Sequence, residues 1–294
     1  MKPAGSCRLA LGTVQFGLPY GIANQTGQVG PGDVGAMLDL AAAAGVTMLD
    51  TAVAYGQSEQ VLGEAGTARF QVVSKLPACT GSPDGIRDWV AAQCRDSLTR
   101  LGCRQLYGLL LHRPSQLTES RGAELYAALR ALQQQGLVRK IGISVYGPSE
   151  IATVLEHYPV DLVQAPFNLV DRRLLTSGWL DRLSNSGVEV HVRSAFLQGL
   201  LLLPTDRLPE RFAPWKELFL RWHRWLCDQA IQPLEAALAF AMAPAGISRV
   251  VVGADSTSQL SQILAAAAAV RHISFPDIAS DDEALINPAR WSSP

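Results

Sequence analysis

The stretch GVTMLDTAVAYGQSEQVLG, residues 45–63, decides how the rest of the chain is interpreted. It opens with a short apolar run that ends at Asp50, continues through a polar turn that carries Tyr55, and enters a helical pattern at Ser58. An acid and a phenol therefore straddle the end of an expected strand. In a barrel of parallel strands, this end is the rim on which active sites are built.

Short apolar runs alternate with helical patterns on both sides of this stretch. Such alternation is typical of parallel strands joined by helices. Eight strand–helix units of roughly 30 residues match an α/β fold of the (β/α)8 TIM barrel type. The doubly wound alternative is disfavoured, because LGTVQFG after the first strand is not a G-x-G-x-x-G sequence. The expected strands lie at 8–17 (with its exit loop), 46–50, 70–76, 106–112, 137–145, 160–166, 188–194 and 248–254.

Helices are expected between these strands. Pro31 opens the first, because proline is tolerated in the first helical turn, and Gly45 ends it. No low-complexity linker interrupts the alternation, which predicts one domain over 1–294 with residues 271–294 as a tail across the barrel. The other helices are expected from Ser58, at 82–101, at 124–136, from Pro148, within 174–187, at 233–242 and at 258–269.

The composition argues against several classes of protein. The formal net charge of −1 provides no basic excess for binding nucleic acid or a membrane surface. No apolar run reaches the roughly 20 residues that span a bilayer, and the N-terminal MKPAGSC has no apolar signal core. Five scattered cysteines without a C-x-x-C pair fit a reducing compartment. We therefore expect a cytoplasmic protein that acts on a small molecule, and its oligomeric state is left open.

Polar side chains stand at the carboxyl ends of the expected strands, which share one rim in a (β/α)8 barrel. Asp50 and Tyr55 follow the second strand. Lys75 follows the third strand and His112 the fourth, so an acid, a phenol, an amine and an imidazole occur on neighbouring strand ends. The later strands contribute, in order, Ser144, Gln164, Arg193 with Ser194, and Gly253.

The first four residues of this set are suited to proton transfer at an oxygen. A tyrosine phenol, with an ordinary pKa of about 10, is a weak acid, and a neighbouring lysine ammonium favours its phenolate form. An aspartate would keep the lysine charged and oriented, and a neutral histidine could hydrogen-bond a substrate carbonyl. Taken singly, Asp50 is more often a helix cap and Lys75 a surface charge. Their joint occurrence on neighbouring strand ends favours a catalytic role over these structural ones.

The same residues resemble the aldo-keto reductase superfamily, over essentially the whole chain. LDTAVAYGQSEQVLG matches the family's pattern DTA-x-x-YG-x-SE-x-x-LG, and SKL and LLLHRP follow at the right intervals. The resemblance implies that Tyr55 is the general acid/base and that Lys75 makes its phenol more acidic. It also implies that Asp50 anchors the lysine and that His112 orients the substrate carbonyl.

The resemblance further implies a nicotinamide cofactor and no metal. Members of the family transfer hydride from NADPH, less often NADH, to an aldehyde or ketone. In this chain the nicotinamide is expected at Ser144, Gln164 and Arg193. The phosphates and adenosine are expected near Ser194, Leu197, Gln198, Gly199, Gly253, Asp255, Ser256, Gln259 and Gln262.

Three positions depart from the family's pattern. Val145 follows Ser144 where many members have asparagine, which removes one carboxamide. Arg193 stands where an aromatic ring often stacks on the nicotinamide, and a planar guanidinium can also stack. The loop after the last strand contains Asp255 and lacks a lysine or arginine for the 2′-phosphate of NADPH. Because a carboxylate repels a phosphate but accepts from a ribose hydroxyl, NADH is a serious alternative.

Three functions remain open at this point. The first is an NAD(P)H-dependent reductase of a small aldehyde or ketone. Its substrate could be sugar-like, because Tyr20, Phe196 and Trp291 suggest an apolar or sugar-stacking pocket. The second is a nicotinamide-binding regulatory or scaffold protein of the same fold with little turnover. The third, a metal-dependent barrel hydrolase, ranks last because the sequence offers no metal-ligand spacing.

Overall fold

Eight parallel strands form a closed barrel in which each strand pairs with its neighbours in the sequence, and the last pairs with the first. This computed structural model describes residues 8–24, 26–81, 85–269 and 273–291. The (β/α)8 barrel predicted from the sequence is confirmed. The strands are β1 (Leu9–Gly12), β2 (Met48–Asp50), β3 (Gln71–Leu76), β4 (Leu106–Leu111), β5 (Val138–Ser144), β6 (Leu162–Pro166), β7 (Glu189–Arg193) and β8 (Arg249–Val252).

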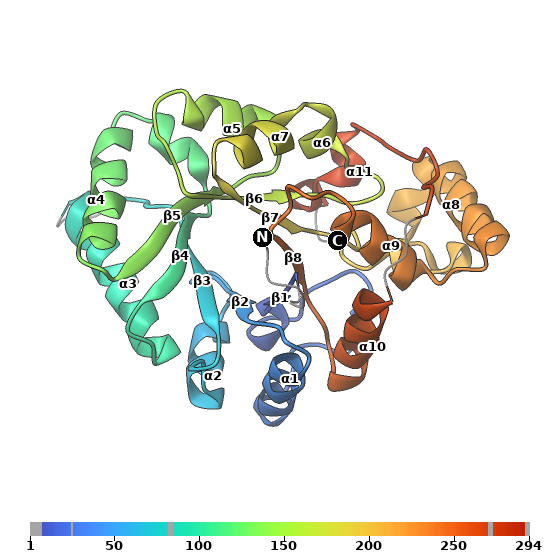
Figure 1. Cartoon of the computed structure of the whole chain (residues 1–294), viewed down its shortest axis with the longest axis horizontal. Helices are drawn as coiled ribbons and strands as arrows, with labels where there is room; N and C mark the ends of the chain where they lie inside the picture. Colours follow the sequence, from blue (N-terminus) through green and yellow to red (C-terminus); the bar gives the residue numbers. More distant parts are fainter. Residues whose placement is uncertain (1–7, 25, 82–84, 270–272, 292–294) are drawn as a thin grey trace.

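Helices surround the barrel as an outer layer (Figure 1). Pro31 begins the first helix, as expected, and short 3₁₀ helices follow β1 (Val14–Phe16) and β4 (Pro114–Thr118). The α-helices are α1 (Pro31–Ala43), α2 (Ser58–Ala65), α3 (Ile86–Leu101), α4 (Gly122–Gln134), α5 (Pro148–Leu155), α6 (Arg173–Thr176), α7 (Trp179–Asn185), α8 (Lys216–Gln229), α9 (Pro233–Met242), α10 (Thr257–Ala268) and α11 (Glu283–Ile286).

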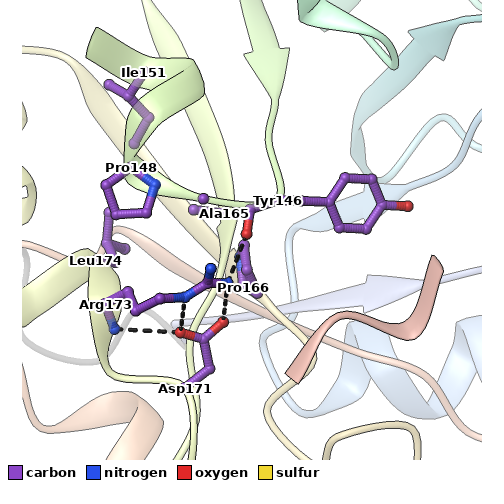
Figure 2. A pocket seen from close by; sticks show the side chains of 9 residues that line it. Tyr146, Pro148, Ile151, Ala165, Pro166, Asp171, Arg173 and Leu174 are labelled. Carbon is purple, nitrogen blue, oxygen red and sulfur yellow. Dashed lines mark hydrogen bonds and ion pairs between the residues drawn. The ribbon is translucent and has the colours of Figure 1, made fainter. Parts of the chain in front are cut away.

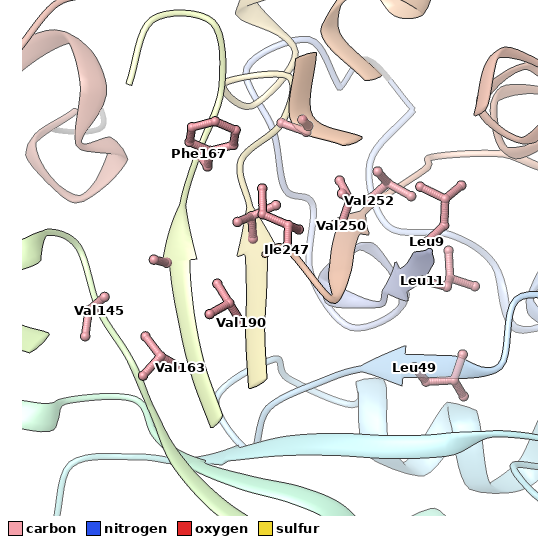
Figure 3. Close-up of a cluster of buried hydrophobic side chains, with 14 of the residues drawn as sticks. Leu9, Leu11, Leu49, Val145, Val163, Phe167, Val190, Ile247, Val250 and Val252 are labelled. Atoms are coloured by element: carbon pink, nitrogen blue, oxygen red, sulfur yellow. The ribbon is translucent and has the colours of Figure 1, made fainter. Parts of the chain in front are cut away.

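The strands separate two buried clusters of apolar side chains. Leu9 and Leu11 belong to the larger cluster, whereas Ala10 between them belongs to the smaller one, as the two-residue period of a strand requires. The larger cluster also contains helix residues such as Leu38, so it fills the layer between strands and helices. Figure 3 shows part of this cluster on the strands, with Leu9, Leu49 and Val250 among its members. Burying each of its large side chains stabilises the fold by about 2 kcal/mol. The smaller cluster faces the barrel axis, below the rim that carries the polar residues.

Two helices differ from the sequence-based expectation. The helix expected within 174–187 is divided into α6 and α7, because Gly178 between them has φ 75° and cannot continue a right-handed helix. The helix expected at 82–101 begins at Ile86 within the described part, and residues 82–84 lie outside it.

The described part of the expected tail, residues 273–291, contacts loops at the carboxyl ends of the strands. The guanidinium of Arg172 donates to the carbonyl of Pro276 (2.5 Å), and the Ser280 amide donates to the carbonyl of Val170 (2.9 Å). Across the described ranges, no helix is long and apolar enough to cross a membrane.

Candidate active site

A buried ion pair lies at the end of β2 and β3. Val73 pairs in register with Asp50, so Lys75 stands two residues further toward the rim. Lys75 Nζ donates to Asp50 Oδ1 (2.5 Å) and to the carbonyl of Thr51 (2.9 Å), and both charged side chains are buried. Burial by itself disfavours the lysine charge, but the charges of Asp50 and Tyr55 outweigh it and raise the pKa of Lys75. Lys75 is therefore a fixed ammonium ion.

Tyr55 and His112 complete the set of four residues that the sequence analysis selected. Lys75 Nζ lies 5.0 Å from the centroid of the Tyr55 ring, and the His112 ring meets the same ring edge-on with centroids 5.9 Å apart. Burial, followed by the charges of Lys75 and Arg193, lowers the pKa of His112 to about 4. His112 is therefore neutral near pH 7, so one of its ring nitrogens can donate a hydrogen bond.

The turn that carries Tyr55 is fixed by close contacts with the loop after β1. A Cβ on Gly17 would lie 1.8 Å from the carbonyl oxygen of Tyr55, so only glycine allows this approach. Ser58 is fully buried, and its hydroxyl donates to the carbonyl of Thr13 (2.8 Å). Gly17 of the loop after β1 and Ser58 at the start of α2 therefore fix the turn that carries the phenol.

Gln164 on β6 lies beside the ion pair and has one carboxamide atom without a partner. Its Nε2 donates to Asp50 Oδ2 (2.6 Å), while its buried Oε1 has no hydrogen bond among the described residues. Ser144 pairs with it in register on β5 and is also buried. A buried unsatisfied acceptor is costly, so this pair is suited to a ligand that brings an amide N–H.

The side chain of Arg193, at the end of β7, extends over the rim to the residues that follow β5. Its Nη2 donates to the carbonyl of Val145 (2.9 Å), and its guanidinium lies over the Tyr146 ring, 4.7 Å from the centroid. Sequence reasoning missed Tyr146, and its position directly after the expected fifth strand was the signal available. Arg173 donates to the Tyr146 carbonyl (2.8 Å), and the ring points away from the Arg173–Asp171 pair (Figure 2).

The loop after β7 has an unusual backbone. Ser194, Leu197 and Gln198 have φ values of 61°, 49° and 53°, in the left-handed region that side chains disfavour. Gly199 follows with φ 90°, and a Cβ on it would lie 2.5 Å from the side chain of Ala23. Gln198 Nε2 also donates to Tyr20 Oη (2.9 Å). The loop is thus held in a strained form against the loop after β1, as is common at ligand-binding sites.

The residues expected after β8 gather at the start of α10, with one exception. Ser256 Oγ caps the helix by accepting from the Gln259 amide (3.1 Å), and Gln259 Oε1 accepts from the Asp255 amide (2.8 Å). Asp255 Oδ1 accepts from Asn24 (3.2 Å), a residue that sequence reasoning missed, and burial raises the pKa of this aspartate. Gln262 is exposed one turn along α10 and is not brought into this group.

Gly253 lies against the side chain of Gln15, a residue of the 3₁₀ helix that follows β1. A Cβ on Gly253 would lie 2.5 Å from Gln15 Nε2, so the glycine makes room for this carboxamide. Gln15 Oε1 is buried and has no hydrogen bond among the described residues. No group of three or more His, Cys, Asp and Glu side chains in the described part of the chain could hold a metal ion.

The fold and this rim define a class of protein: a (β/α)8 barrel with a tyrosine, a lysine–aspartate pair and a neutral histidine at the carboxyl ends of β2 to β4. The model of the aldo/keto reductase family matches residues 8–282, and the chain belongs to that family.

Curated relatives agree with this membership, and a solved structure shares the fold. The chain is 27% identical to the uncharacterized oxidoreductase YqkF of Bacillus subtilis, over 80% of this chain and 82% of that protein. It is 30% identical to the NADH-specific methylglyoxal reductase of Escherichia coli, over 53% of this chain and 54% of that protein. The aldo-keto reductase AKR11C1 of Bacillus halodurans, in its holo form, shares the fold at 21% identity, with a TM-score of 0.73 and 94% of each chain covered. The relatives are therefore oxidoreductases.

Proposed function

We propose that this protein reduces a small aldehyde or ketone to the alcohol with a reduced nicotinamide cofactor, and that Tyr55 is the proton donor. The observation that carries the proposal is the buried Lys75–Asp50 pair, with Lys75 Nζ 5.0 Å and the His112 ring 5.9 Å from the centroid of the Tyr55 ring. A fixed ammonium beside a phenol stabilises the phenolate that remains after proton transfer.

Each of the four residues has one task in this proposal. Tyr55 gives its proton to the carbonyl oxygen. Lys75 stabilises the phenolate that results, and Asp50 keeps the lysine charged inside the barrel. The neutral His112 donates a hydrogen bond to the same oxygen and so aims the carbonyl at the phenol. When bound, the reduced nicotinamide supplies the hydride that the carbonyl carbon accepts.

The residues around the ion pair fit a nicotinamide cofactor. The carboxamide of a nicotinamide has an N–H that suits the unpartnered Oε1 of Gln164, and Ser144 offers a hydroxyl beside it. The strained loop with Gly199 would cover the phosphates, whose charge favours backbone N–H groups. Gly253 and the start of α10 would receive the adenosine end.

Asp255 supports NADH over NADPH. Its carboxylate lies at the start of α10, bonded to Asn24, and could accept from a ribose hydroxyl but would repel a 2′-phosphate. The relative named NADH-specific methylglyoxal reductase is consistent with this preference. Assays with equal concentrations of the two cofactors test it, and an Asp255→Asn variant should use NADPH better. A strong preference of the natural protein for NADPH would contradict the role given to Asp255.

The substrate class is a small carbonyl compound. Relatives named for methylglyoxal and for L-glyceraldehyde 3-phosphate support short, oxygen-rich aldehydes. The preferred substrate can be identified with a panel of such aldehydes, aldoses and keto sugars. Turnover of each compound is measured as the loss of absorbance of the reduced cofactor.

The Tyr55→Phe variant tests the function itself. We expect kcat/KM to fall by at least about 100-fold, the usual size of a general-acid contribution, with cofactor binding retained. The matched control is Tyr126→Phe, because that phenol only donates to the carbonyl of Pro159 in the outer layer (2.7 Å). Full turnover by the Tyr55 variant would overturn the proposal. Tight cofactor binding by the natural protein without oxidation on any carbonyl would instead favour the regulatory role.

A further inference from the structure

The guanidinium of Arg193 carries a charge that no carboxylate in the described part of the chain neutralises. The side chain is half-buried at the rim, and its hydrogen bonds go to two neutral oxygens, the carbonyl of Val145 (2.9 Å) and the hydroxyl of Ser194 (3.3 Å). Within the described ranges, no Asp or Glu oxygen lies within ion-pair distance of it. Two of its five N–H groups are accounted for by these bonds, so the others are available to a ligand.

Arg193 lies on the same part of the rim as the catalytic group: it pairs in register with Pro166 on β6, the strand whose Gln164 donates to Asp50 (2.6 Å). The charge of Arg193 lowers the pKa of His112, after burial and Lys75, and its field also reaches the phenol of Tyr20. The charge of Lys75, by contrast, is balanced by Asp50 at 2.5 Å. Arg193 therefore adds to this part of the rim a positive charge that no carboxylate of the described residues balances.

The rim also fixes the plane of this guanidinium. Tyr146 lies against one face of it at 4.7 Å, and Arg173 anchors the Tyr146 backbone through the carbonyl oxygen at 2.8 Å (Figure 2). Arg173 is itself paired with Asp171 and Glu283, so the tail helix α11 contributes to this support. A guanidinium held in a plane presents its remaining N–H groups in a fixed fork, which is the geometry that matches a carboxylate or a phosphate.

We propose that the substrate is an anionic carbonyl compound, with a carboxylate or phosphate ester that Arg193 binds while the carbonyl lies between Tyr55 and His112. This inference rests on the proposed function and narrows its substrate class. Contact through the edge of the guanidinium leaves its open face available for stacking on a cofactor ring.

Pairs of aldehydes that differ only in charge test the inference. One pair is 4-carboxybenzaldehyde and its methyl ester, and another is glyceraldehyde 3-phosphate and glyceraldehyde, so that the two pairs distinguish a carboxylate from a phosphate. Each pair is assayed with the natural protein and with Arg193→Gln and Arg193→Lys. The control is Arg113→Gln, which removes a charge that is exposed and paired with Glu119 (3.0 Å).

The natural protein is expected to favour the charged member of at least one pair by about tenfold or more in kcat/KM, the size of a charge-assisted hydrogen bond. Arg193→Gln should lower kcat/KM for the charged member about tenfold more than for the neutral member, so that the preference disappears. Arg193→Lys should restore part of it, and Arg113→Gln should leave it unchanged. An equal loss on charged and neutral aldehydes would overturn the inference, because Arg193 would then serve the cofactor alone.

A binding measurement separates this inference from the proposed function. Calorimetry measures the affinity of 4-carboxybenzyl alcohol and of glycerol 3-phosphate for the protein loaded with oxidised cofactor. If no aldehyde is reduced but either anion binds and Arg193→Gln abolishes the binding, the proposed function fails and the anion site stands. If aldehydes are reduced but charged and neutral members react equally and neither anion binds, the anion site fails and the reductase stands.

Discussion

At the scale of single residues, the Lys75–Asp50 pair sets the character of the site. Both side chains are buried, with 1% and 5% of their side-chain surface exposed, and Asp50 also accepts from Gln164. A charge that is removed from water needs its partner close by, because an uncompensated buried charge is strongly destabilising. The pair therefore supports both the fold of the rim and the charge beside Tyr55.

The first prediction separates these two roles. Asp50→Asn leaves the buried Lys75 without its counter-charge, so we expect a loss of about 3–5 kcal/mol in the free energy of unfolding. The double variant Asp50→Asn, Lys75→Met removes both charges and should recover most of that stability while turnover stays low. Urea unfolding and steady-state assays measure the two effects.

Asp39→Asn, which removes the carboxylate of an exposed ion pair with Arg69, is the control and should lower the free energy of unfolding by less than about 1 kcal/mol. Recovery of turnover in the double variant would contradict the role of the lysine charge.

The second prediction concerns the pH dependence that His112 gives to stability. Its pKa falls from 6.5 to about 4 on folding, so the unfolded chain binds more protons than the folded one between these values. Stability must then decrease as the pH falls through this window, by about 3 kcal/mol at most for this residue. The His112→Gln variant lacks this contribution, so its stability relative to the natural protein should rise as the pH is lowered.

Unfolding curves recorded at several pH values between 4 and 7 check this prediction. The exposed His157→Gln variant is the control and should follow the natural protein throughout. Parallel curves for the natural protein and the His112 variant would show that the imidazole is not kept neutral by the fold.

At the scale of elements, the loops after β1 and β7 hold one another over the site. Gln198 donates to Tyr20 Oη at 2.9 Å, and Asn24 donates to Asp255 at 3.2 Å. Gly199 lies so close to Ala23 that an added Cβ would not fit between them. These contacts join three segments that are far apart in the sequence. They also explain why the loop after β7 keeps several left-handed residues, since the neighbouring loop holds them in place.

The third prediction tests this contact between loops. Gly199→Ala places a Cβ 2.5 Å from Ala23 at a residue with φ 90°, so the loops must separate. We expect the dissociation constant for NADH, measured by fluorescence titration, to rise by about tenfold or more, from strain of one or two kcal/mol. Gly136→Ala is the matched control, because Gly136 has φ 73° but no atom within 4 Å of the added Cβ. Similar dissociation constants for both variants would mean that the contact has no part in cofactor binding.

At the scale of the whole molecule, a polar cluster ties strands together at the end of the barrel opposite the site. Glu189, the first residue of β7, forms an ion pair with Lys140 and accepts hydrogen bonds from Tyr107 (2.6 Å) and His191 (2.7 Å). These residues belong to β4, β5 and β7. Burial favours a neutral Glu189, but the bonds from His191, Lys140 and Tyr107 prevail and lower its pKa.

The fourth prediction follows from the sign of this shift. A carboxyl whose pKa is lowered on folding stabilises the fold above its ordinary value and loses that contribution as the pH falls toward the folded value. Glu189→Gln should therefore lower the free energy of unfolding by about 3 kcal/mol at pH 7, and by less at pH 4. The kcat should stay unchanged, since the cluster lies at the far end of the barrel. A variant with reduced kcat and normal stability would contradict this separation.

Membership of the aldo/keto reductase family and the barrel were predictable from the chain, and both are confirmed. The single-domain organisation over 1–294 and the cytoplasmic location stay predictions. The sequence predicts one helix within 174–187, whereas the structure has α6 and α7 there. Gly178 separates the two helices with φ 75°, a left-handed angle that glycine adopts readily and that the period of apolar residues does not predict.

The sequence by itself determined the periodic alternation of strands and helices and the four residues of the rim. Both follow from local rules: side-chain periodicity fixes the elements, and a parallel barrel brings the carboxyl ends of its strands to one edge. The tertiary structure alone decided how side chains from different strands meet. Three contacts join residues that are far apart in the sequence. They are the hydrogen bond from Gln164 to Asp50, the stacking of Arg193 on Tyr146 and the hydrogen bond from Asn24 to Asp255. Such contacts depend on the direction of each side chain after packing, which spacing along the chain does not encode.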